Sequence, residues 1–169
     1  MQRIVSNATP LIYLSKADQL GLLHKMSKEV FIPNAVYREV VIHGKHREEN
    51  DAFRVEQAIR NGCIQVKEVK KICHTNLSIH SGEVEVISLA KEMDIKIVLM
   101  DDIKARTAAE LAGLIPKGTI WLLLKAVKQK ILNFEHFLVV LDNIVKSGFY
   151  LKQDVFLKAV HKAKALSEK

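Results

Sequence analysis

Short apolar segments with strand character alternate along this chain with longer segments of helical periodicity. The clearest strand pattern is Ile95–Met100, which ends abruptly at Asp101 and is followed by an alanine-rich helical pattern. Short apolar runs also occur at Ile4–Val5 and Val30–Ile32, and each precedes a helical pattern. Strands that alternate with helices are typical of an α/β domain with a mainly parallel sheet. The sequence therefore predicts that fold class.

Glycine and proline residues mark the expected ends of the helices. The helical pattern over residues 9–26 is interrupted at Gly21, which predicts two helices there. Pro33 predicts the start of the next helix and Gly44 its end, because proline is favoured in the first turn and glycine after the last. Further helical patterns cover residues 47–61, 84–93, 105–112, 120–131, 134–145 and 153–166, with a strand pattern at 64–69 and a short strand or turn at 149–151.

The composition is that of a folded, basic protein. The chain has 169 residues, of which 49% are hydrophobic and 27% charged, so it can form one domain with a substantial core. The net charge is +7, and residues 113–169 contribute +6 through ten lysines and four acidic residues. Such a positive field attracts phosphate backbones, although solvated helix faces explain it equally well. We expect one domain over residues 1–169, with a basic helical part from about residue 134.

The sequence also predicts the compartment. No apolar segment approaches the ~20 residues that span a bilayer, and the amino-terminal residues lack the features of a signal peptide. Cys63 and Cys73 do not form a CxxC pair, and a disulfide between them is not expected in a reducing compartment. We therefore expect a cytoplasmic protein without a membrane partner.

Five acidic or amide side chains stand at the edges of the expected strands or helices. Asn7, Asp101 and Asp102 follow apolar strands, where ligand sites in parallel sheets lie. Glu39 lies at the edge of the apolar face of its helix, and Glu83 lies in the first turn of another. Taken singly, Glu83 has an ordinary explanation as a charge that complements the helix dipole, and Asp101 and Asp102 as an N-cap and its neighbour. Glu39 is costly if buried unless it is paired or bound to a metal.

Taken together, these side chains predict a site for hard metal ions. Clustered carboxylates repel one another and need a cation to remain ionised. Oxygen ligands select Mg²⁺ or Mn²⁺ rather than zinc, and two such ions roughly 4 Å apart can activate water and stabilise the leaving oxygen of a phosphodiester. On a basic protein, such a site suggests an enzyme that acts on a polyanion.

Five short motifs occur in order over about residues 4–151. They are IVSNATPL (4–11), IPNAVYRE (32–39), GEVEVISLA (82–90), LMDDIKAR (99–106) and GT (118–119). Together they resemble the motifs of the PIN domain (PilT N-terminus), a family of metal-dependent nucleases. More closely, they resemble a prokaryotic branch of PIN-like proteins related to VapC-type toxins.

The resemblance implies a fold, a cofactor and a set of partners. The fold would be a three-layer α/β/α sandwich around a central parallel sheet. The cofactor would be Mg²⁺ or Mn²⁺, with room for two ions, and the substrate would be single-stranded RNA. A homodimer and an antitoxin protein would be the expected protein partners.

The resemblance also assigns roles to individual residues. The metal ligands and catalytic residues would be Asn7, Glu39, Glu83 and Asp101 or Asp102. Thr9 would lie beside them and position water or phosphate. The nucleic acid would be contacted by Lys104, Arg106 and Lys117, for which the alternative is an ordinary solvated surface.

Asn7 departs from the family pattern, in which an aspartate is expected. Asparagine keeps one coordinating oxygen but loses the negative charge, so metal should bind more weakly, and Mg²⁺ most of all. The leading hypothesis is a metal-dependent ribonuclease with a toxin or toxin-like role. The alternative is a degenerate PIN domain that binds RNA or a protein partner without cleavage. A different α/β phosphotransfer or hydrolase enzyme is disfavoured, because the chain has no glycine-rich phosphate loop and no nucleophile elbow.

Overall fold

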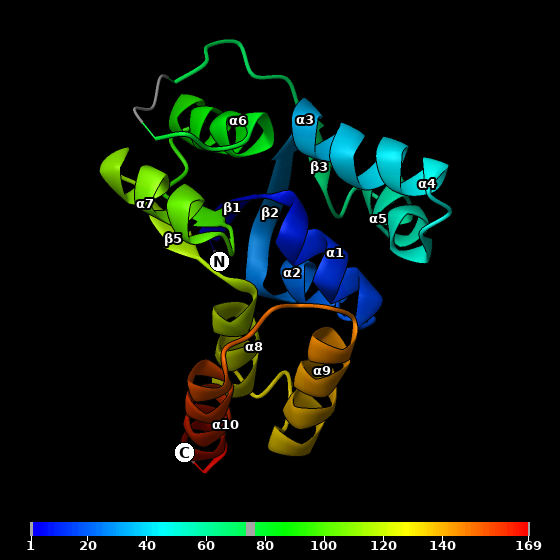
Figure 1. Ribbon diagram of the computed structural model, residues 1–169, viewed down its shortest axis with the longest axis vertical. Coiled ribbons are helices and arrows are strands. Elements are labelled where there is room, and N and C mark those ends of the chain that lie inside the picture. Colours follow the sequence, from blue (N-terminus) through cyan, green and yellow to red (C-terminus); the bar gives the residue numbers. More distant parts are fainter. Residues whose placement is uncertain (1, 74–76, 169) are drawn as a thin grey trace.

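The computed structural model describes residues 2–73 and 77–168, and within them five parallel strands form one sheet in the order β3-β2-β1-β4-β5. Helices flank the sheet on both faces, which confirms the predicted α/β three-layer architecture (Figure 1). The elements in chain order are β1 (Gln2–Ser6), α1 (Ala8–Lys16), α2 (Gly21–Met26), β2 (Ser27–Pro33), α3 (Asn34–Tyr37), the π-helical segment η1 (Arg38–His43), α4 (Gly44–His46), α5 (Asn50–Arg60), β3 (Gln65–Lys67), α6 (Ser81–Glu92), β4 (Ile97–Leu99), α7 (Ile103–Leu111), β5 (Ile115–Lys117), α8 (Thr119–Lys128), α9 (Phe134–Lys146) and α10 (Gln153–Ser167).

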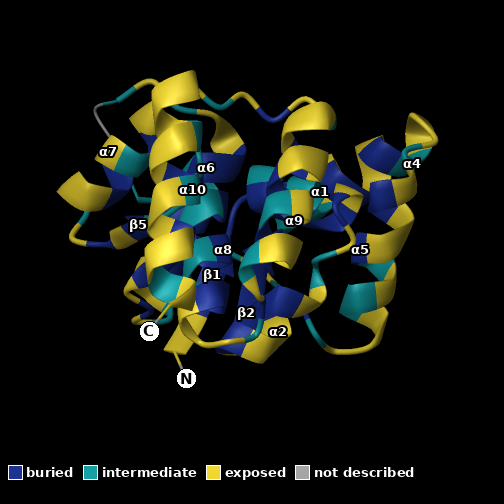
Figure 2. Cartoon of the chain, turned by 90° about the horizontal axis from the view of Figure 1, so that it is seen from below, coloured by how far each residue is buried: buried dark blue, intermediate teal, exposed yellow. Residues whose placement is uncertain are grey.

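β1 is the central strand, and its register fixes where the strands end. It pairs in parallel with β2 on one side and with β4 on the other, where Val5 is opposite Val98 and Ser6 is opposite Leu99. Val5, Val98 and Leu99 are fully buried, as expected for a parallel sheet covered on both faces. Buried segments gather on β1 and β2, while the outer faces of α10 and α4 are exposed (Figure 2). The carboxyl ends of β1, β2 and β4 consequently lie side by side.

The helices that follow these strands start at the same edge of the sheet. α1 follows β1, α3 follows β2, and α7 follows β4 after two aspartates. α6 packs across β1, β2 and β4, so its amino-terminal turn reaches this edge as well. α8 contacts α1, α2, α9 and α10, which makes it the centre of the carboxyl-terminal helical part.

The edge strand β5 was not predicted from the sequence. It has only three residues, Ile115–Lys117, and the middle one is Pro116. Proline cannot donate a backbone hydrogen bond, and it is tolerated in a sheet chiefly on edge strands. Here β5 pairs with β4 alone, so the backbone nitrogen of Pro116, which has no hydrogen to donate, faces away from β4.

The prediction that Gly44 ends a helix is wrong. Helical backbone continues from α3 through η1 into α4, and Gly44 lies within it with φ near −62°. A Cβ at this position would lie 2.7 Å from the Cβ of Ala52 in α5. The glycine is therefore required by the close approach of two helices and not by a helix terminus. Residues 149–151, for which a strand or a turn was expected, form an irregular connection between α9 and α10.

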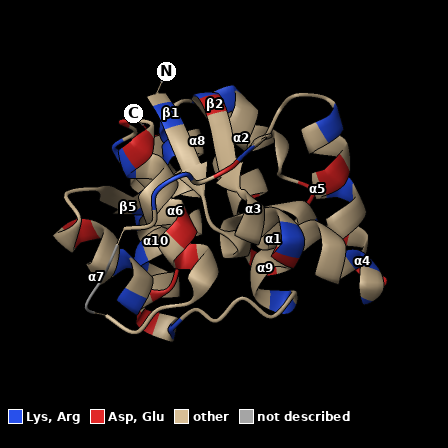
Figure 3. Cartoon of the chain, turned by 90° about the horizontal axis from the view of Figure 1, so that it is seen from above, with Lys and Arg blue, Asp and Glu red and all other residues tan. Residues whose placement is uncertain are grey.

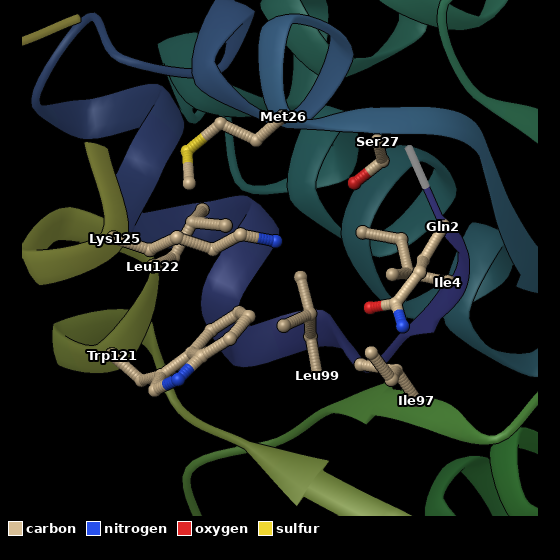
Figure 4. Close-up of a pocket in the computed structure, with 9 residues that line it drawn as sticks. All are labelled: Gln2, Ile4, Met26, Ser27, Ile97, Leu99, Trp121, Leu122 and Lys125. Atoms are coloured by element: carbon tan, nitrogen blue, oxygen red, sulfur yellow. The ribbon is translucent and has the colours of Figure 1, made fainter. Parts of the chain in front are cut away.

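A small cavity of about 10 Å³ lies between the sheet and α8 (Figure 4). Gln2, Ser27 and Ile97 border it at the amino-terminal ends of their strands. The cavity can hold about one water molecule and is too small for a substrate. It is a packing gap at the end of the sheet opposite the carboxyl ends of the strands.

Replacing Gly44 by alanine should destabilise the fold. The added methyl group would clash with Ala52, and overpacking of this kind costs about 1–3 kcal/mol, against a gain of about 1 kcal/mol in helix propensity. We expect the free energy of unfolding in urea to fall by up to about 2 kcal/mol. Gly21→Ala is the matched control, because a Cβ there meets nothing within 4 Å and the variant should be neutral or slightly stabilised. Equal stability of the two variants would contradict this account of Gly44.

Candidate active site

An open pocket of about 540 Å³ lies at the carboxyl ends of β1, β2 and β4. It brings together five of the side chains predicted from the sequence, although they come from separate segments. Its lining residues are Asn7, Thr9, Ala35, Arg38, Glu39, His43, His80, Ser81, Gly82, Glu83 and Asp102. Acidic and basic stretches are interleaved around α6 and α7 in the view from above (Figure 3). The pocket is therefore an acidic site set within a mixed surface.

Asn7 is held at the end of the central strand. Its backbone N–H donates to the carbonyl of Leu99 at 2.8 Å, which extends the ladder between β1 and β4 by one residue. Asn7 occupies the N-cap position of α1, yet its side chain makes no capping hydrogen bond. Only 6% of the residue is exposed, and it lines the pocket. An amide that is free of the usual capping role is available to a ligand in the pocket.

Glu83 is the most buried acid of the pocket. It lies in the first turn of α6, is 6% exposed, and accepts a hydrogen bond from the backbone N–H of His80 at 2.9 Å. Burial is the main cause that raises the pKa of its carboxyl, and the negative charges of Asp102 and Glu39 raise it further. Three carboxylates therefore interact across the pocket, and a cation would favour their ionised forms.

Glu39 reaches the pocket from the π-helical segment η1. Such segments are rare, and they occur frequently at functional sites. A Cβ at Gly82 would lie 3.4 Å from Glu39 Oε2, an ordinary van der Waals distance, so this carboxylate lies directly beside the start of α6. By contrast, Glu85 is directed elsewhere, because it accepts a hydrogen bond from the backbone N–H of Ala35 at 2.9 Å.

The two adjacent aspartates have different surroundings. Asp102 is the N-cap of α7, accepts from the backbone N–H of Ala105 at 2.9 Å, and lines the acidic pocket. Asp101 accepts two hydrogen bonds from Thr119, one from the backbone N–H at 2.8 Å and one from the hydroxyl at 2.6 Å. Both oxygens of Asp101 thus bind the amino-terminal turn of α8, and this residue does not line the acidic pocket.

Asp101 fixes the junction between β5 and α8. Burial raises the pKa of its carboxyl, while the hydrogen bonds from Thr119 and the charge of Arg106 act in the opposite direction. A Cβ at Gly118 would lie 2.7 Å from Asp101 Oδ1, so only glycine fits beside this carboxylate. The glycine–threonine motif at 118–119 therefore has a structural explanation as the partner of Asp101.

The family follows from a match that spans nearly the whole chain. A family model described as a PIN domain matches residues 3–165. The chain belongs to the PIN-domain family. PIN domains have a nuclease-type fold and generally depend on divalent metal ions. No curated protein matches this PIN domain.

The basic residues predicted to contact nucleic acid are distributed unequally in this PIN domain. Arg106 donates to the carbonyl of Met100 at 3.3 Å, and together with Lys117 it lines a second groove beside the acidic pocket. Lys104 is exposed on α7 and lines neither the pocket nor the groove.

In the described ranges, no helix is both long enough and apolar enough to cross a membrane.

Three further residues whose side chains can carry a positive charge line the pocket and were not assigned to it from the sequence. They are Arg38, His43 and His80. The spacing of four residues from Glu39 to His43 is the available signal for one of them, because residues four apart share a helix face. His80 directly precedes the motif that contains Glu83, but its place in a loop gives no periodicity to interpret.

The donor set of this PIN domain fits a hard divalent cation in its chemistry. Glu39, Glu83, Asp102 and Asn7 offer oxygen atoms only, as Mg²⁺ and Mn²⁺ prefer. In residues 2–73 and 77–168, no three acidic, histidine or cysteine side chains form a ready-made cage for an ion. Mg²⁺ usually keeps several waters and needs only one or two carboxylates, so an open pocket of this kind is compatible with it.

Removing the Asp101 carboxylate should weaken the fold. Asp101→Ala leaves the N–H and the hydroxyl of the buried Thr119 without an acceptor, and we expect the free energy of unfolding to fall by about 1–3 kcal/mol. Asp102→Asn is the control, because asparagine caps helices as well as aspartate does, and its stability should stay within about 0.5 kcal/mol of wild type. Urea denaturation followed by circular dichroism measures both. A stable Asp101→Ala variant would rule out the structural role.

Proposed function

We propose that this PIN domain is a metal-dependent ribonuclease that cleaves phosphodiester bonds of single-stranded RNA. The observation that carries the proposal is the convergence of Asn7, Glu39, Glu83 and Asp102 on one open pocket at the carboxyl ends of the strands. These residues come from four separate segments, so neither helix capping nor the helix dipole explains why they meet. A nuclease-type fold with an acidic pocket and a basic chain is well suited to a phosphodiester substrate.

The pocket residues divide into groups with distinct roles. Glu39, Glu83, Asp102 and Asn7 would hold Mg²⁺ or Mn²⁺. When bound, such an ion lowers the pKa of water and neutralises charge that develops on the phosphate. Thr9, which is half-buried beside Asn7, would orient water or a phosphate oxygen through its hydroxyl. Arg38 lines the same pocket and would attract the phosphate backbone.

Asp101 has a positioning role in this proposal and is not a metal ligand. Its hydrogen bonds hold the start of α8, and its neighbour Asp102 is thereby left at the mouth of the pocket. The proposal thus uses one of the two adjacent aspartates for the metal and the other for structure. Lys104 has no role in it, because this residue lines neither the pocket nor the groove beside it.

Asn7 sets the expected strength of metal binding. It contributes one oxygen without charge, so the pocket has three carboxylates where an aspartate at this position would give four. We propose weak affinity for Mg²⁺ and better activity with Mn²⁺. The same observation favours a second candidate function, in which the PIN domain binds RNA or a protein partner without cleavage.

The biological setting is also a proposal. A cytoplasmic toxin or toxin-like protein that is restrained by an antitoxin fits a ribonuclease of this size, and a homodimer is the assembly we expect. The same proposal treats residues 1–169 as one domain. Its support is the PIN-domain family, since the match covers residues 3–165.

Cleavage of a mixed-sequence single-stranded RNA tests the enzyme. We expect wild type to cleave with Mn²⁺ and to stop when EDTA is added. Asp102→Asn should slow cleavage at least about tenfold, which corresponds to about 1.4 kcal/mol of the barrier. Asn7→Asp should accelerate cleavage, because the added charge strengthens metal binding. Gel analysis of end-labelled RNA measures all three.

The same variants separate the two candidate functions. If only Asn7→Asp cleaves, the pocket is assigned correctly and the natural protein is a binding module. If none of the variants cleaves while RNA still binds, the ribonuclease proposal is wrong. Cleavage that persists in Asp102→Asn and in EDTA would point to a contaminating nuclease and would remove the support for this pocket.

Metal binding can be measured without activity. A ligand present at about 100 times its Kd stabilises a protein by about 2.7 kcal/mol, so Mn²⁺ should raise the Tm of wild type. Glu83→Gln should abolish this rise, because it removes the most buried carboxylate of the pocket. Glu85→Gln is the matched control, since Glu85 lies two residues away, outside the pocket, and should leave the rise unchanged. Loss of the rise in both variants would argue against a site at Glu83.

A further inference from the structure

A second, larger groove adjoins the acidic pocket. Its volume is about 980 Å³, and it shares Thr9 and Asp102 with the pocket. From there it extends along the start of α8, with residues 148–155 on the other side. The pocket and the groove therefore adjoin at these two residues.

Tyr150 is the most exposed aromatic side chain at this groove. The residue is 82% exposed, although its neighbour Phe149 is buried. The connection between α9 and α10, which carries Tyr150, is held against α1. The Tyr13 hydroxyl donates to the carbonyl of Gly148 at 3.1 Å, and the Tyr13 ring packs edge-on against Phe149. An aromatic ring presented to solvent by an anchored loop is a stacking platform for a base.

Lysine side chains without ion pairs also line the groove. Lys117, which lines the groove, lies over the Trp121 ring at 5.4 Å from its centroid. Lys125 lies over the same ring at 4.9 Å, but it borders the small cavity of Figure 4 and not the groove. Neither lysine forms an ion pair within the described parts of the chain, and the exposed Lys152 does not either. Lys117 and Lys152 therefore give the groove two positive charges without an ion-pair partner in the described residues, which favours the approach of an anion.

The groove also contains three acidic residues, Asp101, Asp102 and Asp154. Both oxygens of Asp101 accept hydrogen bonds from Thr119, and Asp154 forms an ion pair with Lys158 at 3.5 Å. Asp102 lies at the junction with the acidic pocket. Beyond this junction, the groove offers an exposed aromatic ring and cations that lack acidic partners.

We propose that this groove binds the single-stranded RNA that flanks the scissile phosphate. Tyr150 stacks on one base, while Lys117 and Lys152 contact phosphates. Stacking on a side chain requires an unpaired base, so a single strand is preferred over a duplex. This inference rests on the proposed ribonuclease function, and it specifies the surface that selects the substrate.

Binding measured in EDTA separates this inference from catalysis. The probe is a fluorescein-labelled single-stranded RNA of mixed sequence, followed by anisotropy. Tyr150→Ala should weaken binding about 5- to 150-fold, the range for loss of one stacked base, whereas Tyr150→Phe should bind as wild type does. Phe53→Ala is the matched control, because Phe53 is also an exposed aromatic, at 49%, but lies on α5 away from the groove. A duplex of the same sequence should bind more weakly than the single strand.

The salt dependence tests the lysines. Each phosphate contact contributes about 0.7 to the slope of log affinity against log salt for single strands, so the double variant Lys117→Gln/Lys152→Gln should lower the slope by about 1.4. The control is Lys91→Gln/Lys162→Gln, which removes the same charge outside the groove and should lower the slope less. Thermal unfolding checks that every variant is folded.

The outcomes distinguish this inference from the ribonuclease proposal. Asp102→Asn should slow cleavage at least about tenfold and keep binding that depends on Tyr150. If no variant cleaves but Tyr150→Ala still weakens binding, the groove is assigned correctly and the enzyme is not. If wild type cleaves while Tyr150→Ala and the groove lysine variant bind RNA as wild type does, the inference is wrong, and the groove is left for a protein partner. Equal losses in the groove variants and their controls would also overturn it.

Discussion

The parallel pairing of β1 with both β2 and β4 is the constraint on which the site depends. It places the carboxyl ends of three strands at one edge of the sheet, where the following helices begin. The N–H of Asn7 continues the ladder by donating to Leu99, so the pocket starts where the sheet ends. Slippage by one residue would turn every side chain of β1 to the opposite face, which the buried core forbids. Asn7 is thus held in place by the centre of the sheet.

Electrostatic repulsion is the second determinant of the pocket. Glu83 is buried beside two other acids, and burial together with their charges raises the pKa of its carboxyl. Such an arrangement costs stability unless a cation compensates it. The amide of Asn7 reduces the repulsion at the expense of metal affinity, since an oxygen without charge holds Mg²⁺ less well. The chemistry proposed for this PIN domain therefore depends on whether a bound cation offsets the repulsion among the carboxylates.

Neighbouring residues with the same side chain can have unrelated tasks. Asp101 and Asp102 leave β4 in succession, and one turns toward Thr119 while the other turns toward the pocket. Gly118 is required because a larger residue would collide with the Asp101 carboxylate. The two aspartates look alike in the sequence, but only Asp102 lines the pocket. The hydrogen bonds of Asp101 hold the start of α8 beside the groove proposed for RNA.

The sequence by itself determined the α/β class, the order of most helices and strands, and a short set of polar residues that includes every acid of the pocket. Periodicity and strand ends are local properties, so they can be read without coordinates. Tertiary structure decided what depends on distant partners: the edge strand around Pro116, the close approach at Gly44, and the separate surroundings of Asp101 and Asp102. It also placed Tyr150 beside the groove. None of these follows from local pattern, because each depends on which segment lies opposite in space.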